Sequence, residues 1–186
     1  MITLRRARIA DAVSIGAVHV AAWRSAYPGI LPDEYLAGLS LSRHAAHYER
    51  AIRAGAGVHV AIASGFDLGS RGGVPLVVGF VTGAPARSEA RLAEGEIETL
   101  YVLDDWRERG IGRRLMHCAA GHLAEAGCAS AFLWVLRDNP SRWFYERLGG
   151  RAAAESTIQV AGQAVGQTAY VWSPIARLAQ ATSSAS

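Results

Sequence analysis

Residues 94–127 constrain the fold of this chain more than any other stretch, because a strand, a tight turn and an amphipathic helix follow one another there. The strand is predicted at 96–103, where alternation places Glu96, Glu98, Leu100 and Val102 on one face. The other face holds Ile97, Thr99, Tyr101 and Leu103. After the turn, apolar side chains recur at helical spacing until Gly127: Ile111, Leu115, Ala119 and Leu123.

The turn between this strand and this helix suits an anion. The first turn of a helix carries unpaired N–H groups and the positive end of the helix dipole. Gly110 and Gly112 let the oxygens of a ligand approach the backbone. Positive charge surrounds them, from Arg107, Arg109, Arg113 and Arg114. A phosphate or pyrophosphate is therefore expected here, although a tight connection without a ligand explains the glycines equally well.

Two familiar phosphate-binding patterns do not match. The dinucleotide fingerprint requires a third glycine three residues after the second, and Leu115 stands there. The phosphate loop requires Gly-Lys-Ser/Thr, which does not occur at this turn.

The spacing Arg107-x-x-Gly110-x-Gly112 resembles the acyl-coenzyme A signature of the GCN5-related N-acetyltransferase (GNAT) superfamily, Gln/Arg-x-x-Gly-x-Gly/Ala. The preceding Glu-Ile-x-x-Leu-Tyr-Val resembles the fourth strand of that superfamily, and residues 139–150 resemble a later segment built around an asparagine and a tyrosine. Gly150 replaces the usual aromatic residue after Gly149. The match is specific from about residue 94 to 150 and looser outside that range.

The resemblance implies an α/β (α+β) fold, with one acetyltransferase domain at 1–174 and a C-terminal tail at 175–186. It implies a mixed, mostly antiparallel sheet of about seven strands with helices on both faces. The sequence patterns agree, since strands are predicted at 2–8, 58–63, 75–82, 96–103, 129–135, 151–158 and 164–172. Helices are predicted between them, with Asp11 and Ser42 as N-caps of the first and third. Loops are predicted at 64–73 and 83–91, and a short, fraying helix within 176–186.

The resemblance implies acetyl-coenzyme A as co-substrate. The backbone amides of Leu100, Tyr101 and Val102 would then bond the pantetheine and the thioester, unless they belong to an ordinary sheet ladder. Asn139 would bond the pantetheine arm, cap a helix, or do both. The remaining residues expected at the cofactor are Arg107, Glu108, Arg109, Gly110, Ile111, Gly112 and Arg113, with Tyr145 beside the sulfur.

Amine acetylation requires a base for the amine and a proton for the departing thiolate. Glu96 and Glu98 share a predicted strand face, and neighbouring carboxylates raise each other's proton affinity. By resemblance Glu96 matches a general base, while Glu98 suits the recognition of substrate charge; the alternative for both is an acidic strand end in solvent. Tyr145 matches the proton donor of the superfamily, and its alternative is a core tyrosine flanked by Trp143 and Phe144.

Trp23 and Tyr27 lie four residues apart, so their rings share one helix face. The resemblance places this helix over the acceptor pocket, where the two rings would bind an apolar or cationic part of the substrate. The alternative is that they belong to the core, as aromatic stripes often do.

Composition excludes several other functions. The net charge of +3, from 19 basic and 16 acidic residues, is small for a nucleic-acid-binding protein. The arginines cluster at the two ends and around the glycine turn, which suits a small polyanion better than a nucleic acid. No apolar run approaches the roughly 20 residues of a membrane span, so the cytoplasm is the expected compartment. No metal is expected, because His44, His47, His117 and His122 lack supporting ligands, and Cys118 and Cys128 form no disulfide framework. A homodimer is compatible with the sequence.

The function expected from all of this is an acyl-coenzyme A-dependent N-acyltransferase that moves acetyl directly to a primary amine. Cys118 lies in the middle of a predicted helix, so no covalent enzyme intermediate is expected. The acceptor is left open among small amines, amino acids, antibiotics and peptide amines. The alternatives are a non-catalytic coenzyme A sensor and an interaction module that uses the arginines around the turn.

Overall fold

The computed structural model describes residues 1–65, 74–87 and 92–183. Within these ranges seven strands form one sheet in the order β1-β2-β3-β4-β5-β7-β6. Their bounds are β1 Ile2–Arg6, β2 His59–Ala63, β3 Leu76–Pro85, β4 Gly95–Val102, β5 Ala131–Leu136, β6 Arg151–Val160 and β7 Gln163–Trp172. Neighbouring strands are antiparallel except β4 and β5, which are parallel. The predicted fold class is confirmed.

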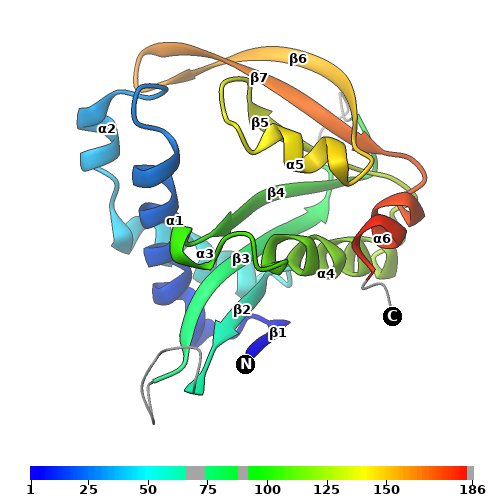
Figure 1. The fold of residues 1–186 in the computed structure, drawn as a ribbon, viewed down its shortest axis with the longest axis horizontal. Coiled ribbons are helices and arrows are strands. Elements are labelled where there is room, and N and C mark those ends of the chain that lie inside the picture. Colours follow the sequence, from blue (N-terminus) through cyan, green and yellow to red (C-terminus); the bar gives the residue numbers. More distant parts are fainter. Residues whose placement is uncertain (66–73, 88–91, 184–186) are drawn as a thin grey trace.

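Helices cover both faces of this sheet. They are α1 Ala12–Ala26, α2 Asp33–Ala37, α3 Leu41–Arg53, α4 Ile111–Glu125, α5 Arg142–Arg147 and α6 Ala176–Thr182. On one face, Ile15 of α1 and Tyr48 of α3 pack against Val60 and Phe80. On the other face α4 crosses β2 and β3 (Figure 1), and its predicted apolar stripe is buried.

The last helix packs into the same core. Leu178 of α6 is fully buried and Ile175 nearly so, both within the cluster that contains α4. His117 of α4 also contacts α6, since its Nδ1 lies 3.1 Å from the hydroxyl of Thr182. The predicted short helix is therefore present and held against α4, while residues 184–186 lie outside the described ranges.

The predicted cap at Ser42 is wrong, and Asp11 is the N-cap residue of α1 as predicted but makes no side-chain cap bond. Asp11 accepts the N–H of Arg8 at 2.6 Å and pairs with Arg5 at 2.7 Å, so it closes the short 3₁₀ turn Ile9–Asp11 and makes no side-chain cap on α1. Ser40, and not Ser42, caps α3, because its extended backbone lets its hydroxyl accept the N–H of Arg43 at 3.3 Å. Strand β3 also runs on to Pro85, into the loop predicted at 83–91. Residues 66–73 and 88–91 of the two predicted loops lie outside the described ranges.

The predicted alternation of β4 fails at Glu98. Thr82 of β3 is opposite Thr99, and Gly83 is opposite Ile97, so Glu98 is an extra residue in a β-bulge. As a result Ile97 packs into the α4 side of the core together with Leu100, whereas Tyr101 packs on the α1 and α3 side. The prediction that Ile97, Thr99 and Tyr101 share one face is therefore wrong, because the bulge shifts the period by one residue.

Candidate active site

A cleft of about 570 Å³ opens where β4 and β5 separate. These strands pair only between Gly95 and Ala131 and between Glu96 and Phe132. Beyond Glu96 they diverge, and both strands line the cleft from there on. Because β3 pairs with β4 on its other side, the backbone groups of β4 that face β5 are left for a ligand.

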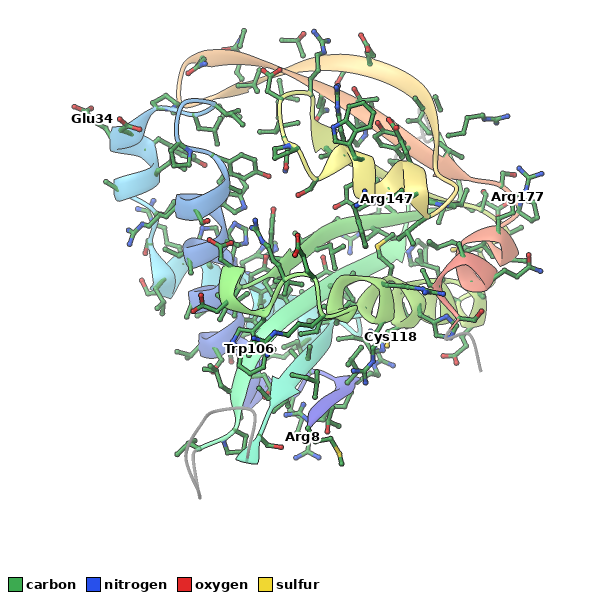
Figure 2. All side chains as sticks on the ribbon, in the orientation of Figure 1. Arg8, Glu34, Trp106, Cys118, Arg147 and Arg177 are labelled. Carbon is green, nitrogen blue, oxygen red and sulfur yellow. The ribbon has the colours of Figure 1, made fainter. Side chains whose placement is uncertain are left out.

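The cleft brings together most of the residues that the sequence singles out. Its lining includes Trp23, Tyr27, Glu98, Leu100, Tyr101, Val102, Arg107, Glu108, Gly110, Ile111, Gly112, Arg113, Asn139 and Tyr145. Glu96 and Arg109 are not part of that lining. Arg109 lies over the ring of Trp106, with its guanidinium carbon 4.8 Å from the ring centroid (Trp106 is labelled in Figure 2). Glu96 lines a second cleft, together with Glu98 and with His47 and Arg50 of α3.

The glycine turn begins with a left-handed residue and is open to solvent. Gly110 has φ +73°, a left-handed conformation that side chains with a Cβ rarely adopt, and it precedes the first residue of α4. No heavy atom lies within 4 Å of the position where its Cβ would be, so the space above the turn is open. A Cβ on Gly112 would come within 3.3 Å of Phe144, so the ring of Phe144 covers the next step of the turn.

The arginines near the turn have different partners. Arg107 pairs with Asp104 at 2.9 Å and donates from Nε to the carbonyl of Val102 at 3.5 Å. Arg113 donates to the carbonyl oxygen of Ser183. Arg114 instead reaches the carbonyl of Ile2 at 3.2 Å, so it is directed to β1 and is not part of the cleft lining.

Arg147 lines the cleft and was not predicted as a site residue. It comes from the end of α5, and Figure 2 shows it on the side of that helix that faces α4. Its spacing of one helical turn from Phe144, which also lines the cleft, is the signal that places both on one face.

The two acidic residues of β4 have different environments. Glu98, the extra residue of the bulge, is exposed and lines both clefts. Glu96 is half-buried, and burial followed by the charge of Glu98 raises the pKa of its carboxyl. Glu98 is therefore the carboxylate of this pair that a ligand in the β4–β5 cleft can reach directly.

Tyr145 presents its phenol to the cleft while its ring is packed. It is 8% exposed, and its ring centroid lies 5.4 Å from that of Phe144 and 6.1 Å from that of Tyr170. Burial, and then the neighbouring phenol of Tyr27, raise the pKa of Tyr145 well above its usual value. No other described residue hydrogen-bonds its hydroxyl, so a protonated phenol is available at neutral pH.

Asn139 uses both ends of its side chain. Its Oδ1 accepts the N–H of Ser141 at 2.8 Å, which shapes the turn into α5. Its Nδ2 donates to the phenolic oxygen of Tyr27 at 3.2 Å. Both the turn-capping role and a place at the cleft are thus present in one residue.

Trp23 and Tyr27 form an aromatic corner at the end of α1. Their ring centroids are 5.0 Å apart in an edge-to-face arrangement, and both rings line the cleft. They also pack with Leu31, Leu36 and Leu136, so both rings belong to the core, and their role in binding the acceptor stays a prediction.

The described residues contain no group of three or more His, Cys, Asp or Glu side chains that could hold a metal ion. Within the same ranges, none of the helices has the length and apolar character that a membrane crossing requires.

Comparison with known proteins places this cleft in context. The model of the acetyltransferase (GNAT) family matches residues 27–150. An uncharacterized N-acetyltransferase of Bacillus subtilis strain 168, YuaI, is 32% identical over 178 residues that cover 96% of both chains. The PaiA N-acetyltransferase of Thermoplasma acidophilum, solved with coenzyme A, superposes with a TM-score of 0.66 at 18% identity, over 90% of this chain and 98% of that one. YncA of Salmonella typhimurium, a putative acetyltransferase solved with acetyl-coenzyme A, gives a TM-score of 0.66 at 21% identity, over 93% and 94%.

Proposed function

Because the chain belongs to the acetyltransferase (GNAT) family and is an N-acetyltransferase, we propose that it transfers acetyl from acetyl-coenzyme A directly to a primary amine. The observation that carries this proposal is the separation of β4 from β5. It opens one cleft to the glycine turn, to the carboxylate of Glu98 and to the phenol of Tyr145.

The chain's own groups fit the coenzyme. The N–H groups at the first turn of α4, with Arg107 and Arg113 beside them, would hold the pyrophosphate. Those backbone groups of Leu100, Tyr101 and Val102 that point away from β3 would bond the pantetheine, because β5 does not pair with β4 there. Asn139 would add a contact to the same arm. Acetyl-coenzyme A supplies the acyl group already activated as a thioester.

Two side chains would manage the protons. Glu98 would accept a proton from the amine, directly or through water, because it is the carboxylate of β4 that faces the cleft. A carbon–nitrogen bond forms and the carbon–sulfur bond breaks. Tyr145 would give its proton to the sulfur and regain one from solvent. Glu96 would act through Glu98, because the two carboxylates are close enough for the charge of Glu98 to raise the pKa of Glu96.

An assay of thiol release from acetyl-coenzyme A with a panel of amines, run beside calorimetry with free coenzyme A, tests this function. Amine-dependent thiol release with coenzyme A binding supports it. Coenzyme A binding with no release for any amine would indicate the sensor alternative. Binding that depends steeply on salt, with no preference for coenzyme A over long polyanions, would indicate the interaction module. A cytoplasmic location and a homodimer stay proposals that were made from the sequence alone.

A further inference from the structure

The charged side chains that line the cleft are unevenly distributed. Arg107, Glu108 and Arg113 come from the turn and the start of α4, and Arg147 comes from the end of α5. Glu98 is the one charged lining residue that the described part of β4 supplies. An acceptor that enters beside β4 therefore meets a single negative charge.

The wall on the other side of that entry is apolar. It is lined by Trp23 of α1, by Tyr27 directly after α1, by Leu136 of β5, and by Ile158 and Val160 of β6. The same five side chains belong to one apolar cluster. The β6–β7 hairpin arches over to the α1–α2 connection (Figure 1), where Gln163 donates to the carbonyl of Ile30 at 3.3 Å. The wall is thus a continuous apolar surface made by α1 and this hairpin.

The arginines around this wall already have partners. Arg107 pairs with Asp104 at 2.9 Å. Arg137 pairs with Glu155 at 3.3 Å and does not line the cleft. Arg24 donates to the carbonyls of Leu36 and Ala37. Arg147 also lines the cleft, but it comes from the end of α5 on the side that faces α4, so the described residues of the wall themselves offer no cation to an acceptor carboxylate.

We propose that the acceptor is a primary amine on an apolar, preferably aromatic, group, with no carboxylate next to the amine. Glu98 binds the ammonium, and Trp23 and Tyr27 bind the apolar group. The physical reason is that a carboxylate against this wall would lose water without gaining a cation. An ammonium ion on the β4 side of the cleft, in contrast, gains the opposite charge of Glu98. The inference rests on the proposed acetyl transfer.

Three phenyl-bearing amines separate the possibilities, with thiol release from acetyl-coenzyme A as the readout. Phenethylamine has no carboxyl group, phenylalanine has a charged one, and phenylalaninamide resembles a peptide N-terminus. The kcat/KM for phenethylamine is expected to exceed that for phenylalanine by about 10²-fold or more. A phenylalaninamide value above that of phenethylamine would identify a peptide N-terminus as the source of the same chemistry.

The remaining outcomes overturn the inference in distinguishable ways. If kcat/KM for phenylalanine equals that for phenethylamine, the inference is overturned and the proposed acetyl transfer still holds. The same holds if glucosamine, a polar amine without a carboxylate, is the better substrate. Failure of every amine to release thiol would overturn both the inference and the proposed function.

A change in the wall gives an independent test. Ile158→Arg places a cation on β6, so kcat/KM for phenylalanine relative to phenethylamine is expected to rise at least about tenfold. Ile158→Met, which keeps the wall apolar, should leave that ratio unchanged. An Ile158→Arg protein that folds, binds coenzyme A and keeps the original ratio would show that the acceptor's substituent lies elsewhere.

Discussion

The side-chain amide of Asn139 donates a hydrogen bond to the phenolic oxygen of Tyr27 at 3.2 Å. Both side chains are buried, at 7% and 6% exposure. The bond joins the loop after β5 to the end of α1, and so fixes the aromatic corner against the segment that leads into α5. The proposed cofactor side and the proposed acceptor side of the cleft therefore share one polar contact.

Tyr27→Phe removes this contact and keeps the ring. Because the Asn139 amide is then left buried without its acceptor, the free energy of unfolding is expected to fall by about 1–2 kcal/mol. Tyr35→Phe is the matched control, since no other described residue hydrogen-bonds the Tyr35 hydroxyl. Equal stability of the two variants in urea denaturation would show that the contact contributes nothing.

Gly110→Asp tests the anion site at the turn. The aspartate places negative charge where the pyrophosphate is proposed, so calorimetry with coenzyme A should show affinity reduced by about tenfold or more. Gly110→Asn is the control, because asparagine has nearly the same shape and tolerates the left-handed conformation of Gly110 without the charge. If both variants bind coenzyme A equally well, the pyrophosphate is not held at this turn.

The strand, turn and α4 could be predicted from sequence because each leaves a local pattern. The apolar stripe of α4 repeats at helical spacing, and the glycines mark the turn. The bulge at Glu98 could not be predicted, because an extra residue leaves the local order of apolar and polar side chains looking like a regular strand. Only pairing with Thr82 and Gly83 of β3 reveals it.

Other parts of the site depend on contacts that sequence spacing does not carry. The bond between Asn139 and Tyr27 joins residues 112 positions apart. Arg147 was overlooked because α5 spans only Arg142–Arg147, too short for a clear periodic face. The cap on α3 was misplaced by two residues because Ser40 and Ser42 are chemically equivalent candidates, and only backbone conformation separates them.

Tyr145→Phe tests the proton donor. Since the pKa of the buried phenol is raised, the hydroxyl is protonated and available at neutral pH. Its loss should lower kcat by about 10²-fold, near the low end for general-acid assistance, because water can partly replace it. Coenzyme A affinity should stay within a few-fold and the melting temperature should hardly change. A lowered melting temperature with wild-type turnover would instead identify Tyr145 as a core residue only.

Glu98→Gln and Glu96→Gln separate the two carboxylates of β4. Glu98→Gln is expected to lower kcat/KM for the amine by about 10²-fold, whereas Glu96→Gln, outside the cleft lining, should have a much smaller effect. Because the pKa of Glu96 is raised in the folded protein, the unfolded chain ionises this group more easily. Its carboxyl therefore lowers the stability of the fold once the pH is above the usual pKa of a glutamate. Glu96→Gln should therefore be at least as stable as the wild type at neutral pH. A larger kinetic loss in Glu96→Gln would reverse the two roles.

The stability of the fold should depend on pH through His19. This ring is 7% exposed, and its Nδ1 lies 2.6 Å from the Tyr48 hydroxyl oxygen. Burial, and then His44 and His47, lower the pKa of His19 to about 3. Below the usual histidine pKa of about 6.5 the unfolded chain takes up a proton that the folded chain does not. As the pH is lowered below this value, the free energy of unfolding should therefore decrease, by at most roughly 1.4 kcal/mol per pH unit for this group.

His19→Asn keeps an amide near Nδ1 and removes the titrating ring. Urea denaturation from about pH 7 to about pH 5 should show this variant losing less stability than the wild type. His117→Asn, at an exposed position of α4 and not among the groups that shift the pKa of His19, is the control and should follow the wild type. Parallel pH profiles for the wild type and His19→Asn would contradict the assignment.

Acetyl transfer itself is tested most directly by mass spectrometry of a mixture of the enzyme, a pool of primary amines and acetyl-coenzyme A with an isotopically labelled acetyl group. The account predicts a labelled N-acetyl amine that accumulates together with free coenzyme A, more slowly with Tyr145→Phe, while the protein carries no label. The result that would contradict it is coenzyme A binding with no labelled amine in the pool, or label that stays covalently on the protein.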